Sequence, residues 1–230
     1  LGHAANYLYM LTGALPTEAQ VRALNTYLNT VIDHGLNAST FTARVIISTQ
    51  SDMISAVGGA GGALKGPPHG GAPGPELVMV FEIGTPERAE AVIQSRLDRG
   101  ERLMGFGHRV YRVRDPRADV LNEAAARFYE HGDQADVYRL ARHVEQVALR
   151  LLRQHRPERK LETNVEFYTA LVLHGLGLPT DLFSPTFAIA RVGWWTAHAF
   201  EQLETKRVVR PASAYTGVKD RAWMPLADRG

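Results

Sequence analysis

The feature that most constrains the fold of this chain is a helical apolar period that returns along most of its length between glycine and proline breaks. Thr17 and Gln20 have the spacing of a capping box, which marks the start of a helix. After them an apolar residue recurs every three or four positions until Gly35, at Val21, Leu24, Leu28 and Ile32. One face of this segment is therefore expected to pack into a core.

The same period predicts helices over the rest of the chain. One is expected from Asn37 or Ser39 through Val57, and the glycine-rich stretch 58–75 after it is expected to be a loop. The others are expected at about 76–82, from Thr85, from Asp115, at about 136–154, in 164–177 and in 182–203. The sequence has no alternating strand pattern and no internal repeat, so the predicted class is all-α.

Composition limits the classes of function. Of the 230 residues 45% are hydrophobic and 22% charged, and no apolar run approaches the roughly 18 residues that span a bilayer. A net charge of +2 gives no general surface for nucleic acid. The lack of cysteine excludes disulfides and thiolate metal sites, and fits a reducing, cytoplasmic location. Because the chain starts at Leu1 inside a predicted helix, we expect a further segment upstream.

Three of the nine histidines stand beside glycine at a helix end or in a loop: His34, His69 and His108. At such positions the backbone can approach a ligand closely. Each histidine alone is as easily structural as functional, but together they could transfer protons or polarise a carbonyl. Their spacing matches no zinc pattern, so no metal is predicted.

The stretch GFGHRVYRVRDPR at 105–117 follows His108 with four arginines and has neither helical nor strand periodicity. So many guanidinium groups beside one imidazole either solvate a loop or hold an anion. Planar guanidinium groups match carboxylates in a bidentate way, which favours a carboxylate or phosphate ligand.

Six segments give the chain a resemblance to the citrate synthase family. They occur in the family's order, and the stretch 105–117 is similar to its most specific signature: DHGLNASTF at 33–41, KGPPHGGA at 65–72, GFGHRVYRVRDPR at 105–117, NVEFY at 164–168, FAIAR at 187–191 and RPASAYTG at 210–217. The resemblance implies a large helical domain with an inserted smaller helical domain. We expect the divisions 1–73, 74–178 and 179–230, with hinges near Gly74 and Leu178.

The resemblance also implies the reaction, a condensation of acetyl-CoA with oxaloacetate followed by hydrolysis of the citryl thioester, with no metal or organic cofactor. His69 would donate to the thioester oxygen, Glu166 would remove the methyl proton, and His108 would polarise the ketone. The implied ligands of the dicarboxylate are His34, Arg117, Arg191 and Arg210. Arg210 would reach the site of a neighbouring subunit, which implies a homodimer.

The chemistry requires Glu166 and His69 to meet at one substrate. A thioester α-proton is far less acidic than a carboxylic acid, so a carboxylate removes it only when the oxyanion is stabilised at the same time and water is excluded. Because Glu166 and His69 are remote in sequence, closure of the small domain after oxaloacetate binds would assemble the site.

Three features depart from the family pattern. Glu166 stands where the family has aspartate, and a displacement of about 1 Å can cost on the order of a hundredfold in rate. Pro73 stands where asparagine often follows His-Gly-Gly-Ala, and it removes a backbone donor. Members of the family also carry further helices upstream, which would cover apolar surface here.

Alternative interpretations stay open at this stage. The chain could be a 2-methylcitrate synthase that uses propionyl-CoA, because one methylene is worth only about 1–3 kcal/mol of discrimination. It could be a non-catalytic relative that binds a dicarboxylate or CoA. A plain helical interaction module would leave the three loop histidines and three matched arginines as coincidence.

Overall fold

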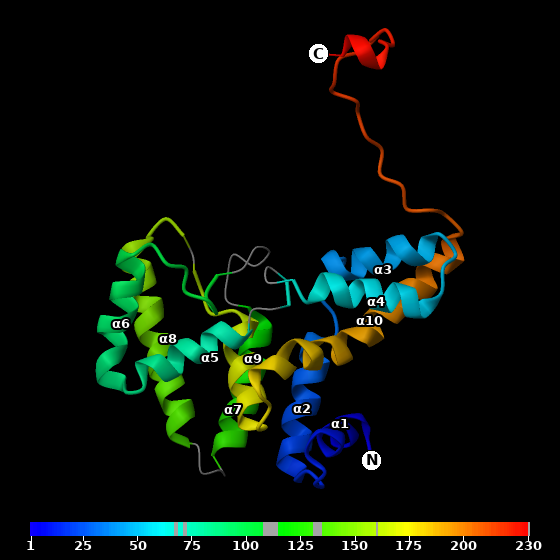
Figure 1. Ribbon diagram of the computed structural model, residues 1–230. Helices are drawn as coiled ribbons and strands as arrows, with labels where there is room; N and C mark the ends of the chain where they lie inside the picture. The colour runs from blue at the N-terminus through cyan, green and yellow to red at the C-terminus, as the bar shows by residue number, and fades with distance from the viewer. Residues whose placement is uncertain (67–68, 71–72, 108–114, 131–134, 160, 230) are drawn as a thin grey trace.

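The computed structural model describes the chain apart from residues 67–68, 71–72, 108–114, 131–134, 160 and 230. The described part is helical, as predicted, and forms no sheet; an isolated antiparallel bridge pairs Phe106 with Thr163. Its helices, shown in Figure 1, are α1 (His3–Thr12), α2 (Glu18–Val31), α3 (Ala38–Ser48), α4 (Met53–Leu64), α5 (Pro73–Ile83), α6 (Pro86–Asp98), α7 (Pro116–Tyr129), α8 (Ala135–His155), α9 (Val165–Gly175) and α10 (Phe183–Thr205), with short 3-10 helices at Thr180–Leu182 and Leu226–Asp228.

The predicted capping box is present at the start of α2. The Thr17 backbone N–H donates to Gln20 Oε1 at 2.8 Å, and the Gln20 backbone N–H donates to Thr17 Oγ1 at 3.2 Å. Two otherwise unpaired donors of the first turn are thereby satisfied, which is why the helix begins there.

The prediction of one helix from 37 to 57 is wrong, because this segment forms α3 and the start of α4. Asn37 caps α3 by accepting the Thr40 N–H at 3.1 Å, and Asp52 caps α4 by accepting the Ser55 N–H at 2.8 Å. Between them Gln50 adopts a left-handed conformation with φ of 63°. The apolar period runs through both helices and conceals this break.

The predicted loop over 58–75 is also wrong at both ends, since α4 continues to Leu64 and α5 starts at Pro73. A Cβ on Gly59 would overlap the Ile46 side chain, so glycine lets α4 pack closely on α3. Pro73 is the first residue of α5, a position where the missing N–H breaks no helical hydrogen bond.

The helices form two groups joined by one core. Figure 1 shows α5 to α9 on one side and α1 to α4 with α10 on the other. The long α10 packs along α2, α3 and α4, whereas α9 packs against α7, α5 and α2. A single apolar cluster contains side chains of both groups. The domain divisions at 73/74 and 178/179 stay predictions.

Beyond α10 the chain continues as a mostly extended and exposed segment, residues 206–229, which we call the C-terminal tail (Figure 1). Near its start the Val209 N–H donates to Ser48 Oγ at 2.9 Å. Large apolar side chains further along are mostly exposed, among them Tyr215, Trp223 and Leu226. No helix in the described ranges is long and apolar enough to cross a membrane.

Candidate active site

Glu166 lies in the first turn of α9, next to the helix cap. Asn164 accepts the Glu166 backbone N–H at 3.0 Å and donates from its amide to the Gly107 carbonyl at 2.9 Å. Burial raises the pKa of Glu166 to about 7, although the positive charges of Arg117 and Arg191 oppose the shift. Near neutral pH this carboxyl can therefore both take and return a proton, as a general base must.

Arg191 is a buried cation on α10, with 1% of the residue exposed. Its Nε donates to the Val31 carbonyl at 3.0 Å, and its guanidinium carbon lies 4.6 Å from the centroid of the Phe187 ring. Burial, and then the charge of Arg117, lower its pKa to about 10, so it stays protonated at neutral pH. Its Nη1 is buried with no hydrogen-bond partner among the described residues. An unpaired buried donor costs about 1–3 kcal/mol, so this atom would gain from a hydrogen bond to a ligand.

Arg117 lies in the first turn of α7 and is held by the residue that caps this helix. Its Nε and Nη2 donate to the two carboxylate oxygens of Asp115 at 3.1 and 2.8 Å. Asp115 is buried and also accepts the Val165 backbone N–H at 3.3 Å. Asp115 therefore fixes the guanidinium of Arg117 relative to the start of α9.

His69 lies in the segment between α4 and α5, where its Nε2 is 2.9 Å from Ser39 Oγ. The Ser39 hydroxyl also accepts the Trp195 indole N–H at 3.1 Å. It has a single hydrogen to give, either to His69 or to Asn37 Oδ1 at 2.7 Å. Burial, and then the charge of Arg191, lower the pKa of His69. When Ser39 donates to Nε2, the neutral ring carries its proton on Nδ1, which can then donate to a ligand.

The structure brings four of the sequence-predicted residues together, and Arg191 is the link between them. Its charge lowers the pKa of Glu166 and of His69, and the charge of Arg117 in turn lowers the pKa of Arg191. The loop that carries His69 is itself bound to α10, because Ser184 Oγ donates to the Gly70 carbonyl at 2.7 Å. A carboxyl, an imidazole and two guanidinium groups, from α9, the α4–α5 segment, α7 and α10, thus lie within electrostatic reach of Arg191 or belong to it.

The other three predicted residues have different outcomes. His34 is half-buried in the turn after α2, three residues after Val31, whose carbonyl binds Arg191. Arg210 is exposed in the C-terminal tail, beyond the end of α10, and the structure does not bring it to this site. His108 lies outside the described residues, as do the three arginines that follow it.

Sequence reasoning missed two contributors to the site. Ser39 was expected only as a possible helix cap, a position that Asn37 occupies instead, and its hydroxyl contacts His69. Tyr27 of α2 is 1% exposed, and burial and then the Glu166 charge raise its pKa well above the usual value. Ser39 lies in the quoted motif DHGLNASTF, whereas Tyr27 looks like an ordinary member of an apolar stripe.

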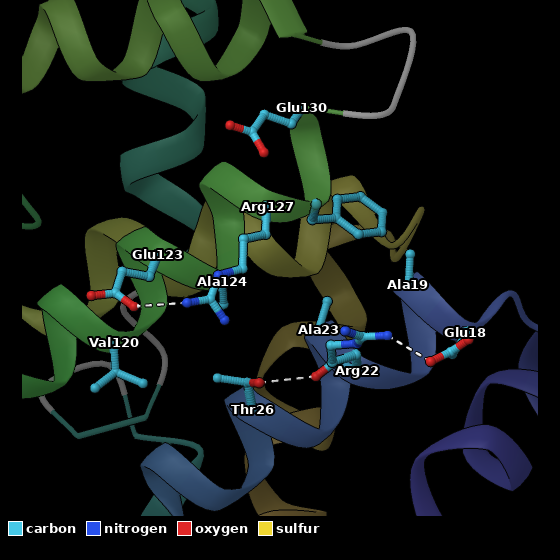
Figure 2. Close-up of a pocket in the computed structure, with 11 residues that line it drawn as sticks. Glu18, Ala19, Arg22, Ala23, Thr26, Val120, Glu123, Ala124, Arg127 and Glu130 are labelled. Atoms are coloured by element: carbon cyan, nitrogen blue, oxygen red, sulfur yellow. Dashed lines mark hydrogen bonds and ion pairs between the residues drawn. The ribbon is translucent and has the colours of Figure 1, made fainter.

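Two surface pockets lie apart from these four residues. Figure 2 shows one between α2 and α7, of about 510 Å³, lined by the exposed ion pairs Arg22–Glu18 at 2.6 Å and Arg127–Glu123 at 3.3 Å. The second, about 410 Å³, lies beside Gly107 and is lined by several basic side chains, Arg102, His155, Arg156 and Arg159. It adjoins the segment that leads to His108. Within the described ranges no group of three or more acidic or histidine side chains could hold a metal ion.

Comparison with known proteins shows to which family the chain belongs. Residues 1–212 match the family described as Citrate synthase, C-terminal domain. The chain belongs to the citrate synthase family. It is 43% identical to Citrate synthase 2 of Bacillus subtilis over 228 residues, which is 99% of this chain but only 59% of that protein. It therefore spans about three fifths of the length of this relative.

Solved structures agree with this family membership. The ternary complex of carboxymethyl coenzyme A and oxaloacetate with citrate synthase from Thermoplasma acidophilum superposes with a TM-score of 0.84 at 33% identity, over 99% of this chain and 60% of that chain. Citryl-CoA lyase from Hydrogenobacter thermophilus superposes with a TM-score of 0.82 at 28% identity, over 99% of this chain and 88% of that chain. The all-α citrate synthase-like fold expected from the sequence is confirmed.

Proposed function

We propose that this chain carries the condensing site of a citrate synthase, which joins acetyl-CoA to oxaloacetate and then hydrolyses the citryl thioester. The observation that carries the proposal is the buried Nη1 of Arg191, which has no hydrogen-bond partner among the described residues and belongs to a cation whose charge lowers the pKa of Glu166. A cation that awaits an anion, next to a base with a pKa of about 7, suits a dicarboxylate beside an enolising acyl group. The relatives named citrate synthase support this reading.

The first step would be proton removal. Glu166 takes a proton from the acetyl methyl group, and the electrons of the broken C–H bond move toward the thioester oxygen. The neutral imidazole of His69 donates to that oxygen as the charge develops. Because Ser39 bonds to the ring and is itself held by the Trp195 indole, the donor is oriented before the charge appears.

The second step would form the carbon–carbon bond. Arg191, Arg117 and His34 hold the dicarboxylate, and the enol carbon attacks its ketone, whose oxygen takes a proton from His108. Water then attacks the citryl thioester and releases CoA. No metal or organic cofactor is needed for these steps, and this expectation stays a prediction.

The acyl-CoA would approach from the side of Gly107. The pocket there is lined by Arg102, Arg156 and Arg159 beside the apolar Leu103 and Phe106. Guanidinium groups suit the phosphates of CoA, and apolar walls suit its adenine ring. The alternative within the same type of reaction is the use of propionyl-CoA to form 2-methylcitrate.

A second candidate is cleavage of citryl-CoA into acetyl-CoA and oxaloacetate. It is supported by the citryl-CoA lyase structure, which superposes on this chain with a TM-score of 0.82. Cleavage would use the same residues in reverse, with protonated Glu166 returning a proton to the enol carbon. A pKa of about 7 makes both protonation states available near neutral pH.

One assay separates these functions. CoA thiol release is followed with oxaloacetate plus acetyl-CoA or propionyl-CoA, and oxaloacetate release is followed from citryl-CoA. Thiol release with acetyl-CoA faster than with propionyl-CoA supports the synthase, and the reverse order supports 2-methylcitrate formation. Oxaloacetate release without condensation supports the lyase. Dicarboxylate or CoA binding with no turnover would identify a non-catalytic relative.

We also propose that two copies associate and that Arg210 of one completes the site of the other. The exposed apolar side chains of the C-terminal tail are surface that a second copy could cover. Co-expressing Arg210→Ala with Glu166→Gln tests this, because only a mixed dimer has one intact site. Turnover near a quarter of the wild-type rate, about what random mixing gives, supports the exchange. No turnover in the mixture contradicts it.

A further inference from the structure

A second buried carboxylate, Glu145 on α8, lies behind the start of α9. It is 2% exposed, and its oxygens accept hydrogen bonds of 2.6 Å from each of three donors, Thr163 Oγ1, Tyr168 OH and Arg142 Nη1. Burial of a carboxylate is costly unless its oxygens are paired, and these oxygens are. Glu145 is therefore a fixed acceptor on a helix that contributes nothing to the four-residue site.

Two of the three donors bracket Glu166 in the sequence. Thr163 comes three residues before it and Tyr168 two residues after it, and both side chains are fully buried. Burial and the bond to Glu145 raise the pKa of Tyr168, so its hydroxyl stays protonated and donates. The first turn of α9 is thus tied at both ends to one carboxylate.

The same attachment reaches the segment that precedes His108. Thr163 pairs with Phe106 in the isolated bridge, and the Gly107 N–H donates to the Glu162 carbonyl at 2.7 Å. The Asn164 N–H donates to the Gly105 carbonyl at 2.9 Å. Any movement of Thr163 would therefore move the backbone on both sides of this pairing.

We infer that Glu145 is a positioning residue of the site, which acts through Thr163 and Tyr168 to set where the Glu166 carboxylate stands. Glutamate has one more rotatable bond than the aspartate usual in this family. Its carboxylate can therefore adopt more positions when the backbone around it is not held in place. A displacement of about 1 Å in a reacting group can cost on the order of a hundredfold in rate. The inference rests on the proposed function for its effect on rate, but not for its effect on Glu166 itself.

The experiment compares Glu145→Gln and Thr163→Val with Thr163→Ser, which restores the hydroxyl, and with Glu90→Gln. Glu90 is a matched control because it is an exposed carboxylate paired with Arg150 of the same α8, at 2.8 Å. Two quantities are measured: kcat and KM in the thiol-release assay, and the titration midpoint of the Glu166 carboxyl by 13C NMR, assigned with Glu166→Gln.

We expect Glu145→Gln and Thr163→Val each to lower kcat by about tenfold or more, with the KM for oxaloacetate changed less than about threefold. The Glu166 midpoint should move down toward that of an exposed glutamate, and Thr163→Ser should recover both values. Wild-type kcat and an unmoved midpoint in Glu145→Gln and Thr163→Val would overturn the inference. An inactive wild-type chain would refute the proposed function alone, because the NMR midpoint still decides the positioning role. If Glu145→Gln does not fold, the two Thr163 variants decide it.

Discussion

Arg191 and Glu145 are both charged and almost fully buried, yet the fold treats them differently. Arg191 keeps one donor that no described residue meets, whereas Glu145 accepts from three donors on two helices and the segment before α9. Arg191 still has room for a hydrogen-bond acceptor, whereas the Glu145 carboxylate has its hydrogen bonds without any ligand. Under the proposed function, the difference separates the residues that would bind substrate from those that would hold the binding residues in place.

The largest expected effect is on stability, at Glu145. Glu145→Leu removes the acceptor of three buried or half-buried donors, so we expect it to lower the free energy of unfolding by about 3–5 kcal/mol. Urea denaturation measures this, with Glu90→Leu as the exposed control. Equal losses in the two variants would remove the contrast between Glu145 and an ordinary surface carboxylate.

At Arg191 the main effect should be on oxaloacetate binding and not on stability. Arg191→Met removes a buried cation that has an unpaired donor but also its bond to the Val31 carbonyl, so the free energy of unfolding should change by less than about 1 kcal/mol. Oxaloacetate binding should weaken by about 2–5 kcal/mol, the range for loss of one partner of a buried charge pair. Calorimetric titration and urea denaturation of the same sample check both. Unchanged affinity with lost stability would reverse our assignment of Arg191.

The pH dependence of stability should sharpen the comparison at Glu166. Its folded-state pKa is about 7 against an ordinary 4.5, so the folded state binds this proton more tightly than the unfolded state. The stabilisation is therefore full below about pH 4.5 and is lost as the pH rises through 7. Glu166→Gln should be more stable than wild type by about 1–3 kcal/mol at pH 8, and the gap should close toward pH 4.5. Curves of unfolding free energy against pH that run parallel for wild type and Glu166→Gln would contradict the raised pKa of Glu166.

The smallest effect is expected at the pocket of Figure 2. Glu18 and Arg22 form an exposed pair one turn apart on α2, and such pairs contribute little. Glu18→Gln should change the free energy of unfolding by less than about 0.5 kcal/mol and leave kcat unchanged. A large loss of turnover in this variant would show that the pocket between α2 and α7 takes part in the reaction.

The fold was largely predictable because its signals are local. The capping box at Thr17 and the prolines at 86 and 116 each mark a helix start that the structure contains. The wrong helix and loop boundaries lie in segments whose structure depends on contacts between helices or on one unusual backbone conformation. Glycines that would suit a loop instead let α4 pack against α3 at Ile46, and a left-handed Gln50 divides a continuous apolar period.

Residues of the candidate site could be predicted where they belong to a sequence motif. Residues whose role depends on a contact with a distant part of the chain could not. Glu166, His69, Arg117 and Arg191 all lie in motifs quoted from the sequence, and the structure brings them together. Ser39 and Glu145 act through contacts with residues 30 and 18 positions away. Helical periodicity shows which face of a helix is buried, but not which polar group it meets there.

The central claim is that Glu166 is the base that enolises the acyl group, and one measurement tests it directly: thiol release by Glu166→Gln and Glu166→Asp with oxaloacetate and acetyl-CoA. Glutamine keeps the shape of the side chain but cannot take a proton, so we expect its turnover to fall by about 10²–10⁴-fold, while aspartate keeps or raises the wild-type rate. Turnover by Glu166→Gln at the wild-type rate would remove Glu166 from the reaction and contradict the account.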